Sequence, residues 1–114
     1  MRESKARALL RGVPRGTHWR VLDAGCGSGR LLAAVLRAAG TSGVRVACEG
    51  VEVDAAAARW AAALEPVVRA GAREALLGWS VRCADFLLDG RTGPSFDAAI
   101  ANPPYVTLRD LDAG

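Results

Sequence analysis

The chain has 114 residues, of which 51% are hydrophobic and 24% charged, and its formal net charge is +3. This length has room for one small domain, and the composition is that of a globular protein. The three cysteines lack metal-ligand spacing and no nucleophile elbow accompanies the single histidine, which argues against a metal site and a Ser-His-Asp hydrolase. Without a signal peptide or a membrane-spanning apolar run, a cytoplasmic protein is expected.

The amino-terminal segment, residues 1–18, predicts a helix over residues 2–12 and a linker at residues 14–16. Much of the positive charge of the chain falls here and just beyond, at Arg2, Lys5, Arg7, Arg11, Arg15 and Arg20. We interpret these side chains first as the solvated face of a helix. A basic stretch is also compatible with a nucleic-acid partner.

A glycine-rich turn follows the first predicted strand, residues 19–23. Residues 24–30 read Ala-Gly-Cys-Gly-Ser-Gly-Arg and lead into a helix over residues 31–39, which we expect Gly40 to end. Glycines let the backbone approach a ligand closely, and a helix N-terminus attracts its anionic or polar end. Arg30 stands where a dinucleotide fingerprint needs glycine, and no Gly-Lys-Ser/Thr follows, which excludes a P-loop. A tight turn without a ligand is the alternative.

Acidic residues follow the next two predicted strands. At the end of the second predicted strand, residues 44–53, Glu52 or Asp54 falls where doubly wound folds place a carboxylate for ribose hydroxyls. Because Asp54 also suits the N-cap of a helix starting at Ala55, we assign the ribose to Glu52. After residues 79–83, Asp85 can accept from the amino group of an adenine and Phe86 can pack on its face. The alternatives are that Asp85 is a solvated loop residue and that Phe86 is a core residue.

The most specific pattern is Asn-Pro-Pro-Tyr at residues 102–105, after a fourth predicted strand over residues 96–101. The prolines fix φ and remove two backbone donors, so the loop is stiff. The Asn102 side chain can accept hydrogens of an NH₂ group, and Tyr105 can stack on the group's ring. The pattern therefore predicts a site that holds a flat amine or amide for a reaction at nitrogen.

All these groups follow the carboxyl ends of successive predicted strands, where open α/β sheets bind ligands. We therefore expect an α/β fold with flanking helices and four parallel strands in the order 3-2-1-4. No helix fits comfortably between the third and fourth strands.

On these motifs the chain resembles the class I S-adenosylmethionine-dependent methyltransferases, which have a Rossmann-like sheet. Within them it most resembles the adenine-N6 DNA methyltransferases of restriction–modification systems that carry Asn-Pro-Pro-Tyr. The resemblance covers residues 19–108 and rests on residues 23–29, 50–54, 84–88 and 96–105. It implies S-adenosyl-L-methionine as cofactor, no metal, and a flipped-out adenine of DNA as acceptor.

The resemblance also implies roles for individual residues. The implied cofactor-binding residues are Asp23, Gly25, Cys26, Gly27, Glu52, Asp85 and Phe86, and the implied catalytic residues are Asn102, Pro103, Pro104 and Tyr105. Asp23 and the glycines would serve the methionine end, and Glu52 the ribose. Asn102 and the Pro103 carbonyl would grip the target amino group, localise its lone pair and aim it at the methyl carbon.

Two other interpretations stay open. A protein-glutamine or RNA-base methyltransferase can share the same elements, and the chain can be a cofactor-binding remnant without catalysis. We expect residues 19–114 to be the cofactor-binding half of a methyltransferase domain, with its remaining strands and a target-recognition domain missing. Such a fragment would leave the apolar fourth strand at an open edge and would be inactive by itself.

Overall fold

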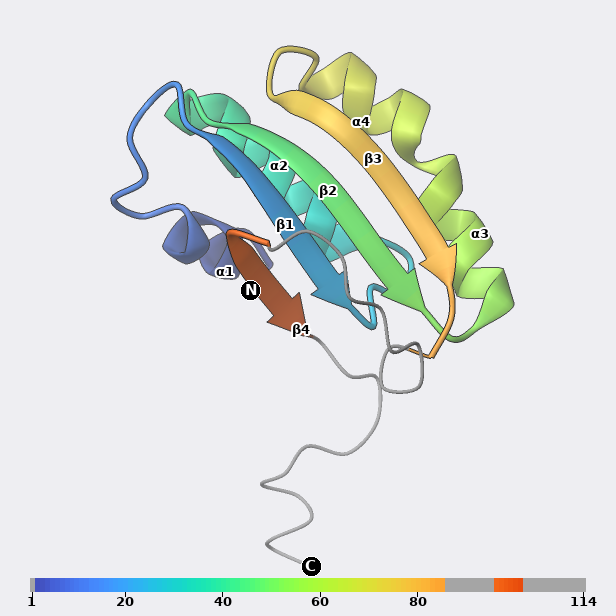
Figure 1. Ribbon diagram of the computed structural model, residues 1–114. Coiled ribbons are helices and arrows are strands. Elements are labelled where there is room, and N and C mark those ends of the chain that lie inside the picture. Colours follow the sequence, from blue (N-terminus) through green and yellow to red (C-terminus); the bar gives the residue numbers. More distant parts are fainter. Residues whose placement is uncertain (1, 86–95, 102–114) are drawn as a thin grey trace, which may run out of the picture.

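A computed structural model describes residues 2–85 and 96–101. Within them a parallel sheet runs in the order β3-β2-β1-β4, as predicted (Figure 1). The strands are β1 (His18–Ala24), β2 (Arg45–Glu52), β3 (Leu76–Cys83) and β4 (Ala98–Ala101). The α/β class and the strand order expected from the sequence are therefore confirmed.

The helices are α1 (Arg2–Leu9), α2 (Arg30–Ser42), α3 (Ala55–Ala63) and α4 (Glu65–Gly71). Figure 1 shows α2, α3 and α4 on one face of the sheet, and α1 lies against α2. None of the helices in the described part of the chain is long and apolar enough to cross a membrane.

The core lies between this face of the sheet and the helices. Parallel register aligns Val21, Cys48 and Trp79 across the three longer strands, and all three are buried. The Trp79 indole N–H donates a hydrogen bond of 2.9 Å to the carbonyl of Ala61 in α3, so the indole is both packed and satisfied. On α2, Leu32 and its neighbours complete the core.

Two predicted boundaries were wrong. Helix α2 does not end at Gly40 but continues to Ser42, because Gly43 takes the left-handed C-cap conformation, φ 73°, and donates to the Ala39 carbonyl. A mid-helix glycine costs only about 1 kcal/mol relative to alanine, too little to end a packed helix. The third strand begins before the predicted residue 79: α4 ends at Gly71, and β3 already begins at Leu76, which is buried and pairs with Val46.

The β4 strand is shorter than expected, and the residues before it set its position. The Arg20 backbone N–H donates to the Asp97 carboxylate at 2.8 Å, and the Asp97 N–H donates to the Arg20 carbonyl at 2.9 Å. The Arg20 guanidinium also lies 4.8 Å from the centre of the Phe96 ring. Residues 86–95 lie outside the described residues, so the expected helix-free crossover stays a prediction.

Candidate functional site

The glycine turn joins the end of β1 to α2. Gly25, Gly27 and Gly29 all have left-handed φ angles, 83°, 55° and 86°, which residues with a Cβ adopt only under strain. A Cβ added to Gly27 would meet nothing within 4 Å, so this part of the turn opens onto free space. A Cβ on Gly29 would instead lie 3.2 Å from side-chain atoms of Ala61 and Leu64. The turn therefore packs on one side and is accessible on the other.

The end of β2 holds this turn in place. The Gly25 and Cys26 backbone N–H groups donate to the Val51 carbonyl, at 2.7 and 3.1 Å. One Glu52 carboxylate oxygen accepts from the Gly27 N–H at 2.7 Å, and the other accepts from the Asp54 N–H at 2.9 Å. Hydrogen bonds to a charged acceptor are among the stronger ones in proteins. Glu52 is therefore a buried clamp between the two strand ends.

Asp23, in β1, is the most unusual residue of the site. Its side chain is fully buried, and neither carboxylate oxygen has a hydrogen-bond partner within residues 2–85 and 96–101. Burial, followed by the nearby Glu52 charge, raises the pKa of Asp23 to about 7. A buried carboxylate without partners is unfavourable, so this position favours a ligand that brings positive charge or hydrogen-bond donors.

The Cys26 side chain points away from the open side of the turn. Its thiol is buried in the core, and a Cβ added to Gly50 would lie 2.7 Å from its sulfur. Burial raises the pKa of this thiol to about 12. A ligand contact expected at Cys26 would therefore come from its backbone. The isolated glycine in a strand pattern, Gly50, was the sequence signal for this close approach.

The N-terminus of α2 lies next to the open part of the turn. Its N-cap, Gly29, provides no side-chain hydrogen bond, and the first turn carries no acidic residue. Its backbone N–H groups and positive dipole end are thus suited to a carboxylate. In α3, by contrast, Asp54 accepts from the Ala56 N–H at 3.2 Å, which confirms the predicted N-cap.

Two further positions lie at the carboxyl ends of β2 and β3. Asp85 is exposed and follows β3, which is tied to β2 by the Ala84 N–H donating to the Glu52 carbonyl at 3.0 Å. Val53, directly after Glu52, is 67% exposed and was not selected from the sequence. The sequence signal that could have identified Val53 is its place between two acidic residues, Glu52 and Asp54, at a strand end. Phe86 lies outside the described residues, so its adenine contact stays a prediction.

The expected catalytic residues, Asn102 to Tyr105, also lie outside the described residues. The strand that precedes them is described. β4 ends at Ala101, whose Cα partner in β1 is Ala24, so β4 runs to the same edge of the sheet as the glycine turn (Figure 1). Within the described ranges, no His, Cys, Asp or Glu cluster could hold a metal ion.

Sequence comparison finds one informative relative. No protein-family model matches the chain. The chain is 33% identical over 107 residues to the release factor glutamine methyltransferase of Caulobacter vibrioides. That match covers 91% of this chain but 32% of the relative, so the chain spans about a third of the length of that protein.

Solved structures identify the fold. The type I restriction–modification methyltransferase subunit of Streptococcus thermophilus superposes with a TM-score of 0.69 at 21% identity, covering 91% of this chain and 22% of that one. A methyltransferase of Thiobacillus denitrificans, in complex with S-adenosyl-L-homocysteine, gives 0.59 at 20% identity, covering 88% and 35%. The chain therefore has the fold of the class I S-adenosylmethionine-dependent methyltransferases, over its first four strands.

Proposed function

We propose that this chain is the cofactor-binding half of an S-adenosylmethionine-dependent N-methyltransferase. The observation that carries the proposal is the buried, unpartnered Asp23 carboxylate next to the open glycine turn, as seen within the described residues. A methyltransferase with a similar fold was solved with S-adenosyl-L-homocysteine, the demethylated form of this cofactor. When bound, the cofactor supplies an electrophilic methyl group on a sulfonium, and the residues of the chain bind and orient the reactants.

The residues of the site match the charges of this cofactor. Its methionine end carries an ammonium and a carboxylate, and its sulfonium adds a second positive charge. The Asp23 carboxylate supplies the negative charge that these cations need, and the uncapped N-terminus of α2 suits the carboxylate. Gly27 lets the backbone approach without a side chain in the way.

Glu52 can serve the ribose in addition to the turn. A carboxylate has about four lone-pair positions, and the N–H groups of Gly27 and Asp54 occupy two of them. Two positions remain for the ribose hydroxyls. In this proposal Val53 offers an apolar contact beside them, and Asp85, which follows the neighbouring strand β3, accepts from the adenine amino group.

For the acceptor we propose first the amide nitrogen of a protein glutamine. The observation in its favour is the 33% identity to a release factor glutamine methyltransferase. In this proposal Asn102 and the Pro103 carbonyl accept both hydrogens of the side-chain amide. Those hydrogen bonds aim the nitrogen at the methyl carbon and stabilise the positive charge that grows on it.

The second candidate is the N6 amino group of adenine in DNA, which presents the same planar NH₂ chemistry. The observation in its favour is the likeness to the restriction–modification methyltransferase subunit. This acceptor would have to be flipped out of the duplex. The two are distinguished by transfer of a labelled methyl group to glutamine-containing peptides or to DNA, measured on a polypeptide in which this half is joined to the other half of a methyltransferase domain. Transfer to neither by that polypeptide would contradict both.

Cofactor binding is tested by calorimetric titration of S-adenosylmethionine into the chain and two alanine variants. Gly27→Ala should weaken binding by about tenfold or more, about 1.4 kcal/mol, because its methyl group would enter the open side of the turn. Gly12→Ala is the matched control. Gly12 also has a left-handed φ, 81°, and open space around it, but it lies in the connection between α1 and β1.

Both variants should lose a similar amount of stability, about 1–2 kcal/mol, from the left-handed backbone strain. A difference in affinity between them then reports the position of the ligand. Equal affinity in Gly27→Ala and the unsubstituted chain would contradict the site, and no binding by the unsubstituted chain would contradict the cofactor.

A further inference from the structure

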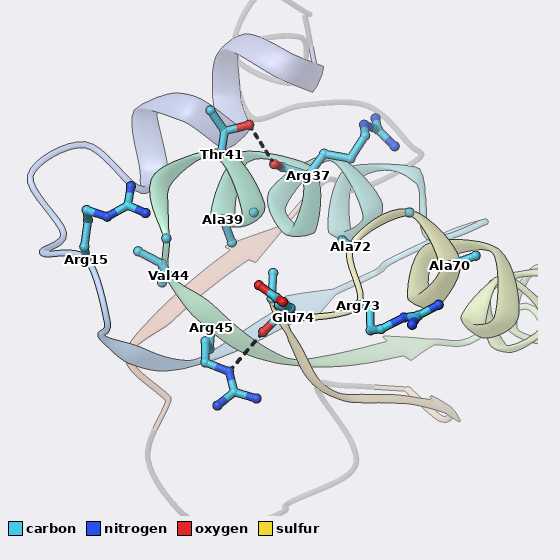
Figure 2. A pocket seen from close by; sticks show the side chains of 14 residues that line it. Arg15, Arg37, Ala39, Thr41, Val44, Arg45, Ala70, Ala72, Arg73 and Glu74 are labelled. Carbon is cyan, nitrogen blue, oxygen red and sulfur yellow. Dashed lines mark hydrogen bonds between the residues drawn. The ribbon is translucent and has the colours of Figure 1, made fainter.

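A second concave region lies at the opposite end of the sheet from the glycine turn. It is formed where β2 begins, where α4 leads into β3 over residues 70–75, and by the end of α2 (Figure 2). Its volume is about 1090 Å³. The proposed function makes no use of this region.

Arginine dominates the charge of this hollow. Arg15, Arg37, Arg45 and Arg73 line it, against a single acidic residue, Glu74, among the described residues. Arg37 is already neutralised by an ion pair with Glu3 of α1. We call the region lined by Arg15, Arg45, Arg73 and Glu74 the arginine hollow.

The three remaining guanidinium groups are available to a ligand. The Arg45 Nε donates to the Glu74 carbonyl at 3.0 Å, which leaves its two terminal nitrogens for other acceptors. Arg15 and Arg73 form no ion pair with any residue in the described ranges. Both are exposed, and Figure 2 shows the three arginines coming from separate segments of the chain. The hollow thus has a surplus of two positive charges.

We propose that the arginine hollow binds the phosphate backbone of a nucleic acid. Guanidinium groups recognise phosphate oxygens through paired hydrogen bonds. The volume lies slightly above the range of about 300–1,000 Å³ that is typical of small-molecule pockets, and the arginines are spread over three segments. The Arg15, Arg45 and Arg73 side chains point in different directions (Figure 2), which suits several phosphates better than a single one. No aromatic residue of the described chain lines the hollow, so we expect no stacking on the bases. Contacts to phosphate oxygens carry no sequence information, and the proposed binding is therefore independent of sequence.

The arginine hollow lies far from the proposed methyl-transfer site. A strand of seven residues, such as β1, extends over about 23 Å, and the glycine turn lies at its far end. A nucleic acid bound in the hollow therefore leaves the turn free. The proposal holds for either acceptor and does not rest on the proposed function, and S-adenosylmethionine should not change the affinity.

The test is fluorescence anisotropy of a short fluorescein-labelled DNA duplex titrated with the chain at several salt concentrations. Arg73→Gln is the main variant, because the Arg73 side chain has no hydrogen bond within the described residues whose removal would affect folding. Arg45→Gln is the second variant. Arg59→Gln, an exposed arginine of α3 outside the hollow, is the control with the same change of charge.

Each hollow variant should weaken binding several-fold and reduce the slope of log K against log salt by about 0.9 for each phosphate that it no longer neutralises. The control should keep the slope, and Glu74→Gln should strengthen binding. Two duplexes of unrelated sequence should bind equally.

Three results would overturn the proposal. The first is an equal effect of Arg59→Gln and Arg73→Gln, which would mean diffuse attraction. The second is displacement of the duplex by polyglutamate at the same charge concentration, which would indicate an acidic protein partner. The third is displacement by inorganic phosphate at a similar phosphate concentration, which would indicate a site for one phosphate.

Discussion

The buried carboxylate of Asp23 gives the most quantitative prediction, which concerns the variant Asp23→Asn. Burial raises the pKa of this group from its usual 3.8 to about 7, so the folded chain holds a proton that the unfolded chain releases between these values. The free energy of unfolding should therefore fall as the pH rises from about 4 to 7. At about 1.4 kcal/mol per pH unit, the full decrease is ~4 kcal/mol.

Asparagine has nearly the same shape but no charge, so it removes this pH dependence. We expect Asp23→Asn to match the unsubstituted chain near pH 4 and to be more stable at pH 8, by up to ~4 kcal/mol. The same variant should bind S-adenosylmethionine more weakly, because it lacks the negative charge that we propose to attract the cationic ligand. The substitution thus exchanges binding for stability.

The assay is urea unfolding followed by circular dichroism across this pH range, with calorimetry for the ligand. Asp54→Asn is the control, because Asp54 is exposed and asparagine is an equally good N-cap. The difference between each variant and the unsubstituted chain cancels the titration of other groups. Equal pH dependence in Asp23→Asn and the unsubstituted chain, or lower stability of the variant at pH 8, would refute the reasoning.

Two further predictions concern the cysteines. Gly50→Ala should destabilise the fold by about 1–3 kcal/mol, because the new Cβ would lie 2.7 Å from the Cys26 sulfur. In urea unfolding, adding Cys26→Ala to this variant should relieve part of the destabilisation. Additive effects of the two substitutions on the free energy of unfolding would contradict the contact. In the native chain, a chromogenic disulfide reagent should label the exposed Cys83 quickly, whereas Cys26 and Cys48 should react only on unfolding. The reason is that burial raises the pKa of both of these thiols to about 12. Fast labelling of all three cysteines would contradict the packing.

The sequence predicted those parts of the fold that depend on local patterns. Strands alternating with helical segments predict a parallel sheet, and the acidic residue before an alanine-rich segment predicted the Asp54 cap, which the structure confirms. The predicted end of α2 was wrong because the local sequence does not distinguish Gly40 from Gly43 as the residue that ends the helix. The structure distinguishes them: Gly43 takes the left-handed C-cap conformation and donates to the Ala39 carbonyl, whereas Gly40 stays within the helix.

The site was predictable in position but not in its internal contacts. Asp23, Gly27 and Glu52 could be selected because each lies at a predicted strand end. Two features depend on contacts between distant segments, namely the two backbone hydrogen bonds of Glu52 and the packing of Cys26 against Gly50. A local pattern can mark Gly50 as a point of close approach, but it does not specify the partner in such a contact. The arginine hollow was missed for the same reason, because its residues come from separate segments.

The double attachment of Glu52 has a mechanical consequence. Since one side chain fastens the loop after β1 and also the start of the loop after β2, neither loop can shift without pulling on the other. Recognition of the amino-acid part and of the sugar part of a nucleoside ligand would then be coupled through a single residue. Grafting either loop alone onto another scaffold would leave it without its anchor.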